Sequence, residues 1–283
     1  MPTRDERRDE AAKHVALVNG VFAKETKEAI ASAQIYEDGE GRELELPDPA
    51  FEETKTQVTT EFASSALHRA EGKIVVIDPA SFTRPGGAYE DGSFGPEQIL
   101  CANSNLYPVL QAMKSTYYNA NRGYQCGQLF TGRSLYLEDI VFTHNGDMKK
   151  ADVLAIAEPN RQHALENHRS ERECDKVLAD RVEAIMRIAA AHTCETLIVG
   201  AFGCGREAGS ENYTITLFKN WIEAHPGVIG TVVFAVPRLH FAAFDAAFGQ
   251  PKAPVEKKPV PAAEEEDDFA LDFDLPEGVS LRS

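Results

Sequence analysis

The sequence predicts an α/β fold in which helices cover both faces of one sheet. Short apolar runs typical of buried strands alternate with helical patterns from about residue 73 to residue 248. Two of these runs, Ile74–Asp78 and Thr196–Val199, lead directly into glycine-rich loops that precede helical patterns. In an open α/β sheet, loops at the carboxyl ends of neighbouring strands line one crevice. We therefore expect the two glycine loops to face one ligand.

Composition and charge limit the class of protein. The chain has 283 residues with 43% hydrophobic and 26% charged residues, which suits one globular domain with tails. A formal net charge of −16 argues against a broad nucleic-acid surface, so we expect no direct DNA binding. The five cysteines form no Cys-x-x-Cys pair, which indicates reduced thiols. No secretory signal or membrane span is visible, and we expect a cytoplasmic or nuclear protein.

The first 65 residues are expected to form a helical extension packed on the core. Ala11, Val15, Val18 and Phe22 recur at three- and four-residue spacing within residues 5–24, as in an amphipathic helix. The rest of this extension is polar and mixed, and its prolines at positions 47 and 49 mark a loop.

The core is expected to span residues 66–249. The stretch from about 107 to 126 is rich in aromatic residues and asparagine and gives no clear pattern. After the strand Ile74–Asp78, the remaining elements can be placed in order. The predicted strands are 139–143, 151–157, 196–199 and 230–236, the first two joined by a turn at Asn145–Asp147, and the predicted helices are 172–192, 210–224 (with Ser210 as its N-cap) and 238–248.

Residues 250–283 have the composition of a disordered acidic tail. Within it, residues 264–275 run from acidic residues into an alternation of acidic and apolar residues. Two interpretations remain open: a solubilising tail, or a short motif that docks a protein partner.

The loop from Arg84 to Cys101 organises the predicted site. Gly86 and Gly87 lack Cβ atoms, so their backbone can adopt positive φ and approach a ligand closely. A strand, a glycine-rich loop and a helix in this order present backbone N–H groups to an anion. The acids Glu90, Asp91 and Glu97 lie in the same loop. The combination indicates chemistry on a nucleotide.

The second glycine loop spans residues 200–209. Neither loop ends in the Gly-Lys-Ser/Thr of a nucleoside-triphosphate P-loop. The spacing of Gly203, Gly205 and Gly209 also misses the dinucleotide fingerprint by one residue. From the residues alone, two such loops indicate a phosphate ligand without naming it.

A resemblance names the ligand. Pro85-Gly-Gly-Ala88, seven residues and Pro96-Glu-Gln98 resemble the Gly-Gly-Gly…Gln-Glu-Glu signature of poly(ADP-ribose) glycohydrolases. The chain is more closely similar to the microbial type, a macrodomain with an added N-terminal helical region. Supporting stretches are Ile77–Ser81, Cys101, Leu106–Pro108, Glu158–Asn160 and Gly200–Gly205, so the similarity covers roughly residues 5–248. It implies a macrodomain-like mixed sheet between helices.

The resemblance also implies an ADP-ribose site that needs neither metal nor cofactor. Gly86 and Gly87 would border the distal ribose and the diphosphate, with Ser81 near that ribose. The second loop would hold the diphosphate from the other side. The full set of expected ligand-binding residues is Ser81, Gly86, Gly87, Ala88, Phe202, Gly203, Cys204, Gly205 and Arg206. The implied partners are ADP-ribose or ADP-ribosylated proteins.

The sequence departs from the family pattern where chemistry would occur. In the family, the second Glu of the signature acts as general acid and base, and here that position is Gln98. The first Glu is kept as Glu97. Family members usually follow Gly-Cys-Gly with a small residue and a Phe, where this chain has Arg206 and Glu207.

Three hypotheses follow. In the first, the protein hydrolyses ADP-ribosyl bonds and Glu97 or Glu207 replaces the missing acid, so that Glu97, Gln98 and Glu207 form the candidate catalytic set. In the second, it is a non-catalytic reader of ADP-ribose, because an amide at position 98 cannot exchange protons. In the third, it processes a small ADP-ribose derivative with a terminal phosphate, for which the guanidinium of Arg206 is suited.

Overall fold

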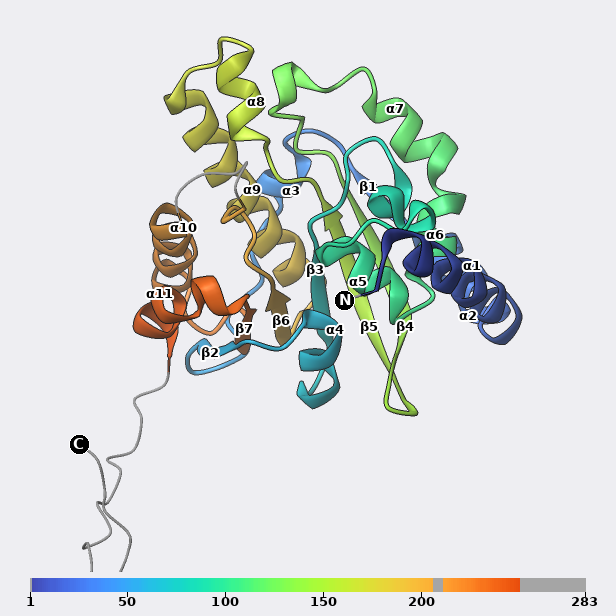
Figure 1. Cartoon of the computed structure of the whole chain (residues 1–283). Helices are drawn as coiled ribbons and strands as arrows, with labels where there is room; N and C mark the ends of the chain where they lie inside the picture. The colour runs from blue at the N-terminus through green and yellow to red at the C-terminus, as the bar shows by residue number, and fades with distance from the viewer. Residues whose placement is uncertain (1, 206–210, 250–283) are drawn as a thin grey trace, which may run out of the picture. The chain divides into compact units, whose positions relative to one another are not determined.

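The computed structural model describes residues 2–205 and 211–249, and it shows seven strands in one mixed sheet with helices on either side (Figure 1). The strands are β1 (Gln34–Tyr36), β2 (Lys55–Thr59), β3 (Ile74–Asp78), β4 (Ser134–His144), β5 (Asp147–Ile156), β6 (Thr196–Val199) and β7 (Thr231–Ala235). Their order is β1-β4-β5-β3-β6-β7-β2. The pairs β1–β4 and β4–β5 are antiparallel and the others are parallel. The predicted fold class is confirmed.

Helices pack on both faces because β3 is apolar on both. Val75 and Ile77 contribute to one core cluster, and Ile74 and Val76 to the other. The helices on the first face are α9 (Glu171–Ala191), α10 (Glu211–Ala224) and α11 (Arg238–Phe248), and those on the second include α1 (Arg4–Val21), α2 (Ala23–Ser32), α5 (Pro96–Ala102) and α6 (Leu106–Ala112). Short helices α3 (Glu40–Glu43), α4 (Ala63–Ala66), α7 (Asn119–Asn121) and α8 (Arg161–Glu166) lie in the connections. This alternation of inward-facing residues along β3 is what a strand covered on both sides requires.

Most predicted elements match the structure closely. The turn at Asn145 joins β4 and β5 as expected, although both strands extend beyond the predicted segments. The stretch that gave no clear pattern is helical: α6 leads through a single π-helical turn, Lys114–Tyr118, towards α7. Tyr117 and Tyr118 are buried there, so tertiary packing stabilises a conformation that local propensity did not indicate.

The first 65 residues contain more than helices. They supply β1 and β2, which form the two edge strands of the sheet. The proposed boundary at residue 65 therefore falls after two strands that pair with the core. No helix in the described part of the chain is long and apolar enough to span a membrane. The predicted acidic tail, residues 250–283 with the motif at 264–275, lies outside the described residues.

Candidate functional site

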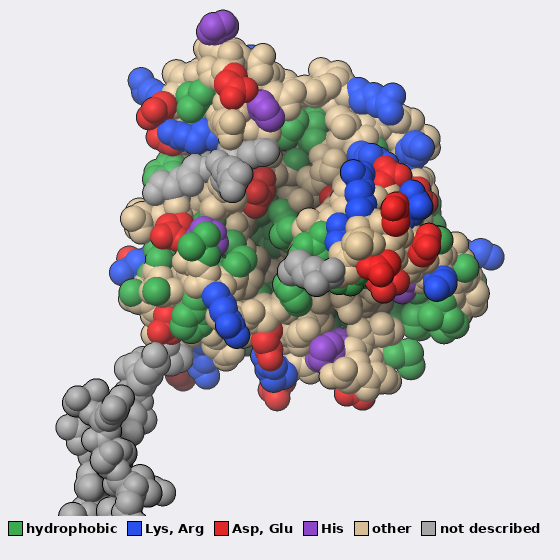
Figure 2. All heavy atoms as spheres, in the orientation of Figure 1, with side chains coloured by type: hydrophobic (Ala, Val, Ile, Leu, Met, Phe, Trp, Pro, Cys, Tyr) green, Lys and Arg blue, Asp and Glu red, His purple; other side chains and the backbone are tan. Residues whose placement is uncertain are grey.

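A large hollow lies at the carboxyl ends of the parallel strands. It is a cavity of about 880 Å³ that begins where β3 ends, and a smaller, strongly apolar cavity of about 420 Å³ adjoins it. The two share Pro79, Phe94, Pro96 and Glu158 in their walls. Figure 2 shows this region as the hollow near the middle of the face. Such a crevice is where open α/β sheets bind ligands.

Three successive residues of the first glycine loop adopt left-handed backbone conformations. The φ angles of Gly86, Gly87 and Ala88 are 66°, 51° and 71°. A Cβ atom on Gly87 would collide with the carboxyl group of Glu97 and the amide of Gln98. Glycine is therefore favoured at position 87 by the left-handed backbone, and a larger residue would displace the Glu97 and Gln98 side chains packed against it.

Glu97 is a buried carboxyl group at the wall of the main cavity. Only 4% of its surface is exposed, and its Oε2 accepts a hydrogen bond of 2.9 Å from the N–H of Ser81. Burial raises the pKa of Glu97 well above its ordinary value, and the nearby charge of Asp78 raises it further. Hydrogen bonds from the backbone of Ser81 and Gly86 oppose this shift without reversing it. The side chain is thus held in place, and its pKa lies well above that of an exposed glutamate.

Asp78, the last residue of β3, is the second buried acid. It is fully buried, and neither carboxyl oxygen has a hydrogen-bond partner among the described residues. Oε1 of Glu97 lacks a partner in the same sense. Burial raises the pKa of Asp78 to about 8. A charged carboxylate without a partner is costly to bury, so the two acids must hold at least one proton between them near neutral pH.

Gln98 holds the first glycine loop by hydrogen bonds. Its Nε2 donates hydrogen bonds of 3.1 Å to the carbonyl oxygens of Gly86 and Gly87. The side chain also lines the main cavity. An amide in this position stabilises the left-handed turn, but it cannot donate a proton and take it back.

Glu158 connects the second glycine loop to the main cavity. Its Oε1 accepts a hydrogen bond of 2.9 Å from the N–H of Gly203, whose φ is 73°. A Cβ on Gly203 would lie 2.8 Å from atoms of Leu178 and Thr214, so this position also requires glycine. Gly203 is therefore held by contacts with Leu178 of α9 and Thr214 of α10 and by its hydrogen bond to Glu158.

The N-terminal helix α1 supports the end of the first loop. The guanidinium Nε atoms of Arg4 and Arg7 donate hydrogen bonds of 2.9 and 2.8 Å to the carbonyl oxygens of Asp91 and Gly92. The Tyr89 hydroxyl is 3.0 Å from Nδ1 of His14. The helical extension thus contacts the first glycine loop directly, in addition to covering the sheet.

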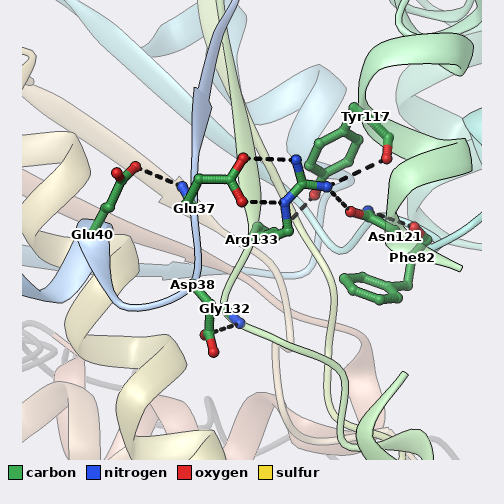
Figure 3. A network of polar contacts seen from close by, with 8 residues as sticks. All are labelled: Glu37, Asp38, Glu40, Phe82, Tyr117, Asn121, Gly132 and Arg133. Atoms are coloured by element: carbon green, nitrogen blue, oxygen red, sulfur yellow. Dashed lines mark hydrogen bonds and ion pairs between the residues drawn. The ribbon is translucent and has the colours of Figure 1, made fainter. Parts of the chain in front are cut away.

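A polar network connects the N-terminal region to the cavity wall (Figure 3). Arg133, only 5% exposed, donates hydrogen bonds of 2.7 and 2.8 Å to the carboxylate of Glu37. It also hydrogen bonds to Asn121, whose Nδ2 donates a bond of 2.7 Å to the carbonyl oxygen of Phe82. Phe82 stacks on Phe130 with ring centroids 4.8 Å apart, and both rings line the main cavity.

The structure brings many of the predicted site residues together. Those that line the main cavity are Ser81, Gly87, Ala88, Glu97, Gln98 and Gly205. Phe202 lines the apolar cavity instead, and Gly86 and Cys204 are buried. The Cys204 thiol lies 3.7 Å from the carbonyl oxygen of Phe202, and burial raises its pKa to about 12. The predicted residues Arg206 and Glu207 lie outside the described residues.

Sequence reasoning did not select Asp78, Phe82, Phe94, Phe130 or Glu158 as site residues. Asp78 and Glu158 each end or follow a buried strand at the carboxyl edge of the sheet, which is a signal that could have identified them. The three phenylalanines come from separate loops, and only the fold brings them to the cavity. No group of three His, Cys, Asp or Glu side chains in residues 2–205 and 211–249 is arranged to hold a metal ion.

Comparison with known proteins agrees with the sequence resemblance. The family model for the catalytic domain of microbial-type poly(ADP-ribose) glycohydrolase matches residues 11–145. A search of curated proteins finds no match. Among solved structures, the chain is similar to the poly(ADP-ribose) glycohydrolase from Thermomonospora curvata bound to the inhibitor ADP-HPD, with 23% identity, a TM-score of 0.74 and coverage of 86% of this chain and 99% of that one.

A second similar structure is the enzyme of the same name from Deinococcus radiodurans in complex with ADP-ribose. The identity is 21%, the TM-score is 0.70, and the match covers 78% of this chain and 96% of that one. At this identity the likeness establishes the fold, and the family model adds the sequence signature of the first glycine loop. Together they support a resemblance of this chain to the microbial-type poly(ADP-ribose) glycohydrolases, whose fold it shares.

Proposed function

We propose that this protein binds ADP-ribose across its two adjoining cavities and hydrolyses an O-glycosidic ADP-ribosyl bond, with Glu97 as the acid. The observation that carries the proposal is the buried carboxyl group of Glu97, at the wall of the main cavity, whose pKa burial raises well above its ordinary value. It lies beside a glycine turn suited to close approach of a sugar and a diphosphate.

The shapes of the two cavities suit the two ends of a nucleotide sugar. The main cavity, at about 880 Å³, falls within the size range of roughly 300–1,000 Å³ for small-molecule sites. The apolar cavity suits a flat base, because Phe62 and Phe94 line it and are 57% and 55% exposed. Large exposed aromatic side chains at a cavity rim are typical of a ligand-binding surface.

Hydrolysis requires one proton to move out and back. The carboxylic acid of Glu97 donates its proton to the oxygen that leaves the anomeric carbon as the C–O bond breaks. Water then forms the new C–O bond at that carbon and returns a proton to the Glu97 carboxylate. Asp78 assists from behind, since the proton that the two acids share prevents two buried negative charges from facing each other.

Release of ADP-ribose from poly- and mono-modified protein tests the proposal. Glu97→Gln should reduce release at least about a hundredfold, as loss of a general acid does, while calorimetry shows ADP-ribose affinity within a few-fold of wild type. Glu207→Gln tests the other acid of the hypothesis in the same assay. Absence of release by wild type from every linkage would refute hydrolysis.

A second candidate function is a non-catalytic reader of ADP-ribose. The contacts of Gln98 favour it, since the amide is engaged by the carbonyl oxygens of Gly86 and Gly87 and supplies no acid. Gln98→Glu separates the two functions. A large gain of release in this variant, over a wild type that binds but does not hydrolyse, would identify the native protein as a reader. Absence of heat with millimolar ADP-ribose would reject both functions.

A further inference from the structure

A second polar cavity lies against the first glycine loop, with Arg84, Ala88 and Glu90 in its wall. Its volume is about 360 Å³, and three cations line it: Arg84, Lys114 and Arg122. The phenol of Tyr107 and the amide of Gln111 form part of the same wall. The cations come from the loop itself, from the π-helical turn and from the residue after α7, so only the folded chain brings them together.

This cavity is lined mainly by positive charges, although the protein as a whole is negatively charged. The chain carries a formal net charge of −16, yet Glu90 is the one acid among the described lining residues. Glu90 accepts a hydrogen bond from the hydroxyl of Tyr107.

Two of the three cations have no ion-pair partner among the described residues. Arg84 forms an ion pair with Asp91. Lys114 and Arg122 form no ion pair with any described acid, and neither side chain donates a hydrogen bond to a described residue. Cations grouped in a concave site without acidic partners favour a bound anion, above all a phosphate.

The cavity adjoins the reacting end of the proposed ADP-ribose site. Arg84 and Ala88 line both this cavity and the main one. Ala88 follows Gly87, which packs against Glu97, so the anomeric carbon in the proposed reaction lies close to this shared rim. A group attached to that carbon on its leaving side therefore has a path towards Lys114 and Arg122.

We infer that the cavity lined by Arg84, Lys114 and Arg122 is a subsite for a phosphate carried beyond the distal ribose of the substrate. The inference rests on the proposed binding of ADP-ribose. Two sources have this chemistry: a single phosphate on the anomeric oxygen of a small derivative, and the diphosphate of the next unit in an ADP-ribose polymer. In either case the cations hold the leaving group and do not take part in proton transfer.

Calorimetry with three ligands tests the subsite: ADP-ribose, ADP-ribose with a phosphate on its anomeric oxygen, and a two-unit ADP-ribose oligomer. Wild type should bind at least one of the last two more tightly than ADP-ribose. The double variant Lys114→Gln/Arg122→Gln should lose this advantage, about tenfold for each charged contact, with ADP-ribose affinity unchanged. The advantage should also shrink as salt concentration rises.

The matched control is Arg172→Gln/Lys176→Gln, the same change of charge at exposed positions of α9 that line neither cavity. It should retain the advantage. Preference for the phosphorylated monomer alone identifies the small derivative as the source, and preference for the oligomer alone identifies the polymer. Equal affinity for all three ligands in wild type overturns the subsite while leaving ADP-ribose binding intact.

If ADP-ribose itself fails to bind, the proposed function fails, and inorganic diphosphate tests the subsite directly. Its binding, followed by NMR shifts at Tyr107 and Gln111, should be present in wild type and in the control and absent in the Lys114→Gln/Arg122→Gln variant. Shifts that are equal in all three proteins, or absent from all three, reject the subsite.

Discussion

The N–H of Ser81 donates a hydrogen bond of 2.9 Å to Oε2 of Glu97. This single contact ties the residue three positions after the end of β3 to the first turn of α5, across the whole glycine loop. It leaves Oε1 of Glu97 without a partner among the described residues. The backbone thereby orients the acid, and its burial, with the nearby charge of Asp78, raises its pKa.

The pH dependence of stability should reveal the buried acid Asp78. Its pKa is raised from 3.8 to about 8 on folding, so the folded state binds a proton that the unfolded state has lost. The contribution of this proton to the free energy of unfolding is fully present below pH 3.8 and is lost as pH rises through about 8. Over this range the free energy of unfolding should fall by up to about 1.4 kcal/mol per pH unit. Asp78→Asn should flatten this slope in denaturant titrations between pH 5 and about 8.

Asp152→Asn is the control for that measurement. Asp152 is also buried, but its carboxylate accepts hydrogen bonds from the Tyr136 hydroxyl and the Asp139 N–H. Its replacement should lower the free energy of unfolding and keep the slope. An unchanged slope in Asp78→Asn would show that Asp78 does not take up a proton on folding. The neighbouring groups that could contribute are Glu97, Cys101, Tyr117 and Tyr118.

Replacing Ala88 with glycine should stabilise the protein. Ala88 has φ 71°, a conformation that costs a residue with a Cβ about 1 kcal/mol or more relative to glycine. Ala88→Gly should therefore raise the free energy of unfolding by about 1 kcal/mol in urea titrations. The same change at Ala12, exposed within α1, should lower it by about 0.5–1 kcal/mol. If the free energy of unfolding fell in both variants, the backbone of Ala88 would not be strained.

The contact between α1 and the first glycine loop should be disrupted by a side chain at position 92. This residue has φ 72°, and a Cβ atom there would overlap the carbonyl oxygen of Arg4. Gly92→Ala should cost about 2 kcal/mol or more and weaken ADP-ribose binding, because α1 or the loop must move. Gly146→Ala is the matched control: φ is 88°, but no atom lies within 4 Å of the added methyl. It should cost only the conformational part, about 1 kcal/mol.

Substitutions in the Arg133 network should lower both the stability of the protein and its affinity for ADP-ribose. Arg133→Met removes a buried cation and leaves Asn121 without its partner, so we expect a loss of about 3 kcal/mol. Glu37→Gln should cost about 1 kcal/mol or less, because the Glu37 side chain is 54% exposed and water screens the pair. ADP-ribose affinity should fall in Arg133→Met, since Asn121 positions the Phe82 carbonyl. Equal losses in both variants would contradict this order.

Much of the fold could be predicted because its signals are local. The apolar run Ile74–Asp78 and the stripe of α9 identify themselves by composition and period. β1 and β2 were missed since both are short edge strands whose residues are only partly buried. The helical turn at Lys114–Tyr118 was missed because packing of Tyr117 and Tyr118, not propensity, holds it.

The sequence by itself displayed two glycine loops after strands, the acid Glu97, and Gln98 at the position where the resemblance leads us to expect an acid. These features depend on residue type and spacing, which the chain displays directly. Only the tertiary structure decided that Asp78 is buried close enough to Glu97 to raise its pKa, that Arg133 supports Phe82 through Asn121, and that three distant cations share one cavity. Burial and proximity between distant segments arise from packing of the sheet against its helices, so neither the raised pKa of Glu97 nor the cavity lined by Arg84, Lys114 and Arg122 could be deduced from residue order.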